Sequence, residues 1–256
     1  MRAPTTELPV IAAEILERLR ADNPRVHCIT NAVAQNLTAN ALLAVGAVPS
    51  MTTSPQEIGG FMQRANALLI NLGTFDGERQ EATEIAIAAA AELKLSWVLD
   101  PALIDRSPTR AIYAKKLIKR APKALRLNRN EFFVLAGLAA DEYMIAAYAN
   151  EQKVVIGLTG PIDIVADGAR LSRIANGDPL MAKVTALGCA ESALVAACLA
   201  VESDAWRATA AALLIMGVAG EIAAKRARGP GSFAVAILDE LYALDREMLI
   251  AQAKVT

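Results

Sequence analysis

The chain has 256 residues, of which 54% are apolar and 21% charged, and its formal net charge is −1. This composition is typical of a globular protein with a sizeable core and excludes a disordered chain. The near-neutral charge and the lack of a basic stripe argue against a nucleic-acid partner. The length fits either one large α/β domain or two small ones.

Apolar segments and cysteine usage bear on the cellular compartment. Residues 1–20 carry acidic side chains and lack a continuous apolar segment, so we expect no signal peptide. The uncharged tract 208–220 is shorter than the roughly 20 residues that span a bilayer, so we expect a buried helix and no membrane partner. Three cysteines without CxxC spacing, beside a single histidine, argue against a structural zinc site. Their odd number is typical of free thiols in a cytoplasmic protein.

Segments with helical and strand-like apolar patterns alternate along the chain. In chain order they predict a helix at 7–22, a strand at 26–30, a helix at 31–46, strands at 48–53 and 67–73, a helix at 76–95, strands at 96–101, 125–128 and 153–160, a hairpin within 163–176, and nearly continuous helix from residue 189. Strands that alternate with helices of this length imply right-handed βαβ units and a mostly parallel sheet. The hairpin predicts an antiparallel edge.

Several predicted strands end at residues that could together form a binding site. These residues are Thr30–Asn31, Met51, Asp100–Pro101, Asn128–Glu131 and Thr159–Gly160. The carboxyl ends of parallel strands meet along one edge of a sheet, which is where ligands bind in such folds. The alternative is that these residues are turn formers that merely end their strands.

Two acidic residues among these strand ends could hold a hard cation. Asp100 ends one strand and Glu131 follows another. Carboxylates in this arrangement can bind Mg²⁺ directly or through its waters. Each could instead cap a following helix.

The turn before residue 189 is a second candidate site. Small residues lead to Gly188 and Cys189, after which the pattern is helical. A helix start favours an anion such as a transferring phosphoryl group, and it stabilises a thiolate. The alternative is that Cys189 is a small buried hydrophobe, which is the role we expect for Cys28 and Cys198. We expect His27, on an apolar strand, to be a core or edge residue.

Two sequence blocks of the chain carry a family resemblance. These blocks are T-N-x-V followed by T-A-N, within 30–40, and G-D-P-L-M-x-K-V-T at 177–185. Together with ALLINLGTF, WVLDP, VVIGLTG and RGPGSF, which occur in the same order, they resemble the hydroxyethylthiazole kinases of thiamine salvage over roughly residues 8–247.

The resemblance implies a single ribokinase-like α/β domain over residues 1–256, with a mostly parallel central sheet flanked by helices on both faces. The implied activity is transfer of the γ-phosphate of ATP to the primary alcohol of 4-methyl-5-(2-hydroxyethyl)thiazole, with Mg²⁺ as the metal cofactor. The implied assembly is a homotrimer with substrate sites at its subunit interfaces.

The resemblance also assigns roles to individual residues. Cys189 matches the family's catalytic cysteine. The other matches are Met51 and Ala186 for the substrate, Arg126, Thr159 and Asn31 for ATP, and Asp100 and Glu131 for the metal. Ala186 stands where the family has the first glycine of G-T-G-C, and Leu127 stands where it has the glycine of R-G-N.

These departures leave two alternatives open. The chain could be a kinase of the same fold for a different small alcohol. It could instead be a homologue that binds a thiazole or thiamine-like ligand and has lost catalysis. Retention of Cys189, Asp100 and Glu131 favours a kinase, whereas the altered turn before Cys189 favours a shifted substrate or lost catalysis.

Overall fold

A computed structural model describes residues 7–256 of the chain. The first six residues, which belong to the domain expected at 1–256 and to the stretch expected to lack a signal peptide, lie outside the described residues. The described strands form one sheet in the order β2-β1-β3-β4-β5-β6-β7-β8. Their bounds are β1 Arg25–Ile29, β2 Val48–Ser50, β3 Ala67–Asn71, β4 Ser96–Asp100, β5 Ala124–Asn128, β6 Val155–Thr159, β7 Asp163–Ala166 and β8 Leu171–Ile174.

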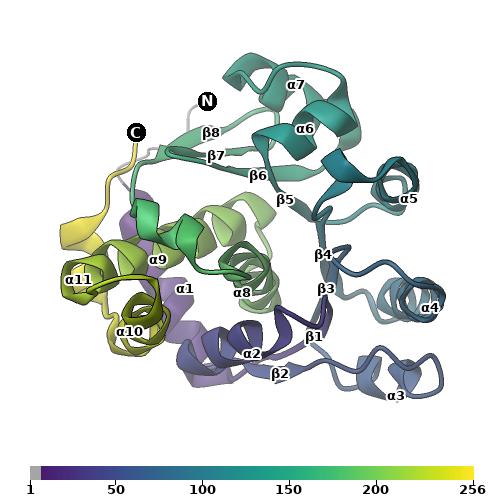
Figure 1. The fold of residues 1–256 in the computed structure, drawn as a ribbon, viewed down its shortest axis with the longest axis horizontal. Helices are drawn as coiled ribbons and strands as arrows, with labels where there is room; N and C mark the ends of the chain where they lie inside the picture. The colour runs from purple at the N-terminus through teal and green to yellow at the C-terminus, as the bar shows by residue number, and fades with distance from the viewer. Residues whose placement is uncertain (1–6) are drawn as a thin grey trace.

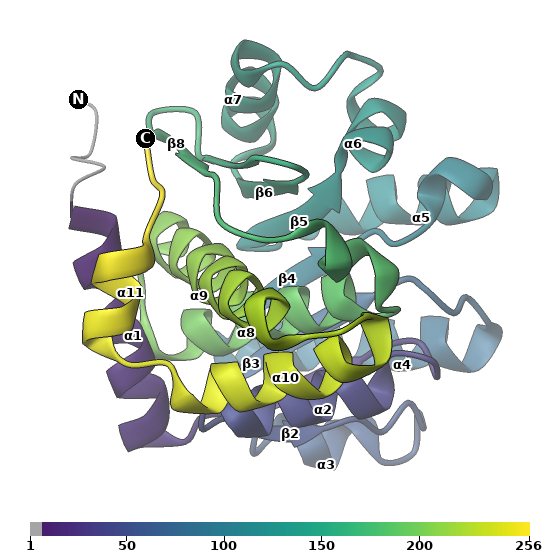
Figure 2. The same cartoon turned by 60° about the vertical axis from the view of Figure 1, so that its left-hand side comes forward.

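The pairing of the strands confirms both parts of the predicted sheet. In the sheet order β2-β1-β3-β4-β5-β6, each strand pairs parallel with the next. Strands β6, β7 and β8 pair antiparallel, and the β7–β8 hairpin forms one edge. The C-terminal residues partly cover this edge, since Thr256 and Arg173 exchange backbone hydrogen bonds of 2.8 and 3.0 Å (Figure 2).

Helices cover both faces of the sheet (Figure 1). One face carries α1 Leu8–Asp22, α2 Gln35–Ala44, α8 Leu187–Val201, α9 Ala205–Arg226, α10 Pro230–Ala243 and α11 Arg246–Gln252. The other carries α3 Ile58–Met62, α4 Gly77–Leu93, α5 Pro108–Ile118, α6 Arg129–Ala136 and α7 Glu142–Gln152. Two short 3₁₀ helices, η2 Ile104–Arg106 and η3 Pro179–Lys183, lie in the connections.

The apolar side chains of the strands belong to two separate cores, one on each face of the sheet. In β3, Ala67 and Leu69 belong to the core under α8 and α9, whereas Leu68 and Ile70 belong to the core under α4. Successive side chains of a strand point to opposite faces, so a strand covered on both faces has an uninterrupted apolar sequence. This explains why β3 was recognisable from sequence as a buried strand.

Helix α9 confirms the buried helix expected around residues 208–220. By length and composition it could cross a membrane, but 78% of its most apolar window is buried in the fold. It contacts α1, α8 and α10, and it approaches β6 so closely that a Cβ on Gly157 would lie 2.9 Å from Thr209. Its apolar surface is therefore used in the core.

The segment between β1 and α2 differs from the prediction. We expected one helix over 31–46, but α2 begins at Gln35. Residues 31–34 form a turn in which the Asn31 side chain accepts a hydrogen bond of 2.9 Å from the Ala34 N–H. Asn31 therefore lies at the end of β1, outside the helix.

Candidate active site

Arg126, on β5, lies at the centre of the polar residues that follow the strands. Its Nε donates a hydrogen bond of 3.0 Å to Oε2 of Glu191, on α8, and its Nη2 forms an ion pair of 2.9 Å with the same oxygen. The two side chains are only 14% and 7% exposed. This buried ion pair connects the sheet to the first turns of α8.

A cavity of about 540 Å³ opens beside this ion pair. Arg126, Glu191 and Gly188 line the cavity together with Thr159 and Asp163, at the end of β6 and the start of β7. The structure therefore brings Arg126 and Thr159, both predicted from sequence, to one cavity. The predicted Ala186 lies directly before Leu187 and Gly188 of the cavity wall.

The turn before α8 has a left-handed residue where the sequence has alanine. Ala186, the N-cap of α8, has φ 70° and ψ 0°. This region favours glycine, because a Cβ there crowds the following carbonyl. The first N–H groups of α8 have no acceptor within the helix and carry its positive dipole end. The turn can therefore receive an anion.

Gly188 is required by close approach of the arginine. A Cβ at this position would lie 2.6 Å from Arg126 Nη1 and 3.0 Å from its Cζ. The guanidinium of Arg126 thus lies directly against the backbone of the anion-binding turn.

Cys189 lies in a cluster of amide side chains. Asn31 Nδ2 and Asn71 Nδ2 lie 3.4 and 3.3 Å from its Sγ. Asn71 Nδ2 also donates to Asp100 Oδ2 at 2.7 Å, and the same oxygen accepts from Ser192 Oγ at 2.8 Å. The structure thereby connects the predicted Asn31, Asp100 and Cys189 through Asn71.

The expected low pKa of the Cys189 thiol is wrong. Burial raises the pKa to about 11, and the nearby Asp100 carboxylate adds to the increase. Hydrogen bonds from Asn31 and Asn71 act in the opposite direction but do not outweigh burial. Burial therefore favours the neutral thiol over the thiolate, and in this form Cys189 can orient a substrate hydroxyl.

The two predicted metal ligands have different surroundings. Glu131 caps α6: its Oε2 accepts from Asn128 N at 2.8 Å, and its Oε1 accepts from Leu103 N at 3.0 Å. Helix capping, one of the two alternatives for Glu131, is therefore observed. Asp100 caps no helix and is held by Asn71 and Ser192. Within residues 7–256, no group of three or more His, Cys, Asp or Glu side chains is arranged to hold a metal ion.

Negative charge accumulates around Arg126. Burial, followed by the charge of Asp100, raises the pKa of Glu131 to about 7, and burial with the charge of Glu191 raises that of Asp163 to about 8. Burial also raises the pKa of Asp100 and of Glu191. Burial by itself would lower the pKa of Arg126. The negative charges of the four carboxylates outweigh burial and raise this pKa. The cluster therefore favours a bound cation or proton.

Met51 is the predicted site residue that lies apart from this cluster. It follows β2, which is four strands away from β5 in the sheet, a separation of about 20 Å at the usual spacing of strands. Its side chain is half-buried against the core under α2, and it does not line the cavity.

The remaining candidates are core residues, as expected. His27 bonds Ser50 Oγ at 2.8 Å and the Thr52 carbonyl at 3.1 Å, and burial lowers its pKa to about 4. Cys28 and Cys198 are fully buried free thiols.

The site also contains residues that were not predicted, among them Asn71, Glu191 and Asp163. Asn71 ends the apolar run of β3, which is the same signal that identified Asp100 on β4. Glu191 is the one charged residue in the apolar sequence of α8, and a lone charge in a buried helix is a signal of a paired or functional group. Asp163 opens the hairpin and carried no such signal.

The comparison with known proteins agrees with this geometry. The model of the hydroxyethylthiazole kinase family matches residues 16–247. A probable hydroxyethylthiazole kinase from Agrobacterium fabrum is 43% identical over 244 residues, which cover 95% of this chain and 94% of that protein.

Solved structures give the same result. The structure of a hydroxyethylthiazole kinase protein from Pyrococcus horikoshii OT3 aligns with a TM-score of 0.92 and 34% identity, covering 96% of this chain and 98% of that one. A ribokinase-like superfamily protein from Enterococcus faecalis aligns with a TM-score of 0.70 at 14% identity, over 91% of this chain and 95% of that one, which supports the fold alone. The fold is ribokinase-like, as expected, and the chain belongs to the hydroxyethylthiazole kinase family.

Proposed function

We propose that this protein transfers the γ-phosphate of ATP to the primary alcohol of 4-methyl-5-(2-hydroxyethyl)thiazole, a step of thiamine salvage. The observation that carries the proposal is the cavity that adjoins both Arg126 and the turn before α8, next to the Cys189 cluster. The cavity supplies a cation and a helix start for phosphates, and the cluster supplies polar groups for an alcohol.

The nucleotide occupies the cavity in this proposal. Its phosphates contact the guanidinium of Arg126 and the free N–H groups at the start of α8. Thr159, which lines the same cavity at the end of β6, also contacts the nucleotide. Asn31 contributes to the phosphate region through its amide, which lies beside Cys189.

The residues present fit a Mg²⁺ ion bound mainly through the nucleotide. Burial, followed by the charge of Asp100, raises the pKa of Glu131, and a cation near the two carboxylates would relieve their repulsion. Mg²⁺ commonly binds one or two carboxylates, with phosphate oxygens and waters as its other ligands. When bound, it neutralises charge on the transferring phosphoryl group.

The substrate hydroxyl attacks the γ-phosphorus, so that an O–P bond forms, the bond from the γ-phosphorus to the bridging oxygen breaks, ADP leaves, and the hydroxyl proton passes to an oxygen of the transferred phosphate. Transfer of this kind has a loose transition state with little early need for a base. Cys189, protonated and flanked by Asn31 and Asn71, orients the hydroxyl in this proposal. Ala186 contacts the substrate through its backbone at the turn.

We infer that the protein acts as a homotrimer in the cytoplasm. Strand β2 lies at an edge of the sheet, and exposed apolar side chains gather on and near it, namely Val33, Leu43, Val48 and Phe61. Such an edge favours association with another copy. Association there places Met51, directly after β2, at a subunit interface, where it contacts the thiazole in this proposal. The free cysteines fit a reducing compartment.

The direct experiment measures ADP release from ATP with the thiazole alcohol, with and without Mg²⁺. We expect turnover that requires both the alcohol and the metal. Turnover with another small alcohol but not with this one would assign a different acceptor. Ligand binding without any ADP release would indicate a homologue that has lost catalysis.

The assembly is tested separately by light scattering at micromolar concentration. We expect the mass of three chains. A fully active monomer would contradict the shared site.

A further inference from the structure

The ion pair between Arg126 and Glu191 has a geometry that bears on how the arginine meets a nucleotide. Nε donates a hydrogen bond of 3.0 Å to Oε2 of Glu191, and Nη2 forms an ion pair of 2.9 Å with the same oxygen. This contact occupies one edge of the guanidinium. Nη1, on the other edge, faces Gly188, where a Cβ would lie only 2.6 Å away.

Arg126 has other partners that compete for its guanidinium. Asp100, Glu131 and Asp163 lie close enough for their charges to act on it. None of the three is hydrogen-bonded to it within the described residues. An arginine free to rotate among three carboxylates would turn away from the anion-binding turn.

We infer that Glu191 is a positioning residue that holds the Arg126 guanidinium against the turn at Gly188, with Nη1 directed to the phosphate region. The inference rests on the proposed nucleotide site at Arg126 and goes beyond it, because the family resemblance assigned no role to Glu191. Glu191 acts by the placement of its acceptor oxygen and not by its charge, which by itself repels a nucleotide.

Steady-state kinetics with varied ATP and saturating thiazole alcohol test the inference. Glu191→Ala should lower kcat/KM for ATP by about tenfold, the size expected when a hydrogen bond to a charged group is lost. Glu191→Gln keeps an acceptor at the same place and should remain within about threefold of the wild type. A Glu191→Ala variant with unchanged or increased kcat/KM would overturn the inference.

A pair of conservative variants separates placement from charge. Glu191→Asp keeps the charge but withdraws it by one methylene, so it should impair kcat/KM more than Glu191→Gln does. The reverse order would show that charge matters and would overturn the positioning role. This comparison also serves if Glu191→Ala fails to fold.

A double variant tests whether Glu191 acts through Arg126. In the background of Arg126→Met, Glu191→Ala should cause no further loss of kcat/KM. A further loss of about tenfold would show that Glu191 acts independently and would contradict the inference. If Arg126→Met itself has wild-type kcat/KM for ATP, the proposed nucleotide site fails, and this outcome is distinct from failure of Glu191 alone.

Glu202 provides a matched control. It follows α8 at the opposite end and pairs with Arg18 at 2.8 Å, away from the cavity. Glu202→Ala should lower the melting temperature and leave kcat/KM for ATP unchanged. A loss of kcat/KM equal to that of Glu191→Ala would indicate a general effect on α8 and would overturn the assignment.

Discussion

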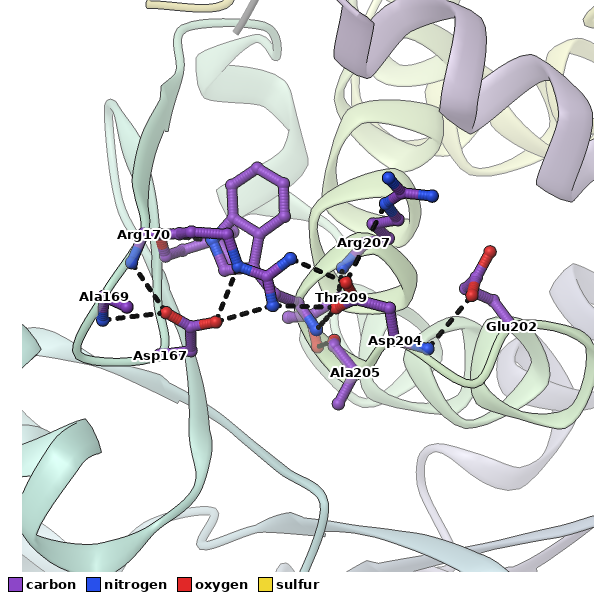
Figure 3. A network of polar contacts seen from close by, with 10 residues as sticks. Asp167, Ala169, Arg170, Glu202, Asp204, Ala205, Arg207 and Thr209 are labelled. Carbon is purple, nitrogen blue, oxygen red and sulfur yellow. Dashed lines mark hydrogen bonds and ion pairs between the residues drawn. The ribbon is translucent and has the colours of Figure 1, made fainter. Parts of the chain in front are cut away.

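Arg170 and Arg126 both lie among carboxylates. The pKa of Asp204, beside Arg170, is lowered, whereas the pKa values of the carboxylates around Arg126 are raised. Arg170, in the turn of the β7–β8 hairpin, donates to both oxygens of Asp204 at 2.6 and 2.9 Å and to Asp167 at 2.7 Å (Figure 3). Its guanidinium also lies over the Trp206 ring, 4.9 Å from the centroid. This group, the Arg170 clamp, fastens the hairpin to the start of α9.

The pKa shifts record the difference. Burial by itself would raise the pKa of Asp204, but hydrogen bonds from Arg170 and from the backbone of α9 outweigh burial and lower it. Around Arg126, burial raises the pKa values of all four carboxylates, and repulsion from a neighbouring carboxylate adds to the increase for Glu131, Asp163 and Glu191. The Arg170 clamp is satisfied by its own contacts, whereas the raised pKa values in the Arg126 cluster mean that it favours an added cation or proton. Such imbalance is common at functional sites.

The largest contrast should come from removing each arginine. Arg126→Met should reduce kcat/KM for ATP by about 100-fold, the usual order for a lost charged donor in a transfer site. Arg170→Met should lower the melting temperature and leave kcat/KM within about twofold, because surface and partly buried pairs act mainly on stability. Kinetics and thermal melting of both variants check the contrast. Equal kinetic losses would remove the distinction between the two regions.

The cysteines allow the same comparison within one helix. Cys189→Ala should lower kcat by about tenfold through loss of an orienting group, and Cys189→Asp should keep or raise it, because a carboxylate is a stronger acceptor. Cys198→Ala leaves a cavity in the core, so it should lower the stability of the protein without changing kcat. Measurement of kcat for the three variants decides the point. If Cys189→Ala matches the wild type, the thiol is only a packing residue.

The Arg126 cluster should make stability depend on pH. Asp163 has a folded pKa of about 8 against an ordinary value of 3.8. Between these values the folded state binds more protons than the unfolded state, so stability falls as pH rises from about 4 to 8. Melting curves at pH 5 and pH 8 should show this fall, and Asp163→Asn should reduce it by a few degrees.

Asp204→Asn is the control from the Arg170 clamp. Its carboxyl has a lowered pKa, so its contribution is lost only in acid, below the ordinary range of an aspartate. The variant should be less stable at both pH values with an unchanged difference between them. If the fall in melting temperature between pH 5 and pH 8 became smaller in Asp204→Asn but not in Asp163→Asn, the pH dependence would come from the Arg170 clamp and not from the Arg126 cluster.

The smallest effect should come from relieving backbone strain at two alanines that have a positive φ. Ala186, with φ 70°, lies in the turn before α8, and Ala121, with φ 57°, lies on the surface away from the site. Glycine at either position should raise the free energy of unfolding by about 0.5–1 kcal/mol, because it adopts a positive φ without strain. Only Ala186→Gly should also improve kcat/KM for the thiazole alcohol. Denaturant unfolding and kinetics of both variants distinguish strain from function.

The sheet could be predicted from sequence because its strands are apolar on both faces and end at polar residues. The run at 67–73 identified β3 for this reason, although the strand ends at Asn71. Helix α3, with five residues and two glycines, has no helical periodicity to detect. Its existence depends on packing over α4 and not on local preference.

Site residues could be predicted from sequence where they end a strand. Contacts that depend on how helices pack on the sheet could not. Arg126 and Thr159 came from the resemblance and lie where the strand ends predicted a site. The pairing of Arg126 with Glu191 joins residues 65 apart and depends on how α8 lies on the sheet. The raised pKa of Cys189 likewise follows from burial, which a helix start alone does not reveal.

The stabilisation of the protein by ATP tests most directly whether the Arg126 cluster, and not the Arg170 clamp, receives the nucleotide. Binding at 100 times Kd stabilises a folded protein by about 2.7 kcal/mol, which is visible as a rise in melting temperature. We expect saturating ATP to raise the melting temperature of the wild type and of Arg170→Met by the same amount, and to leave that of Arg126→Met nearly unchanged. An undiminished rise in Arg126→Met would contradict the assignment of the site.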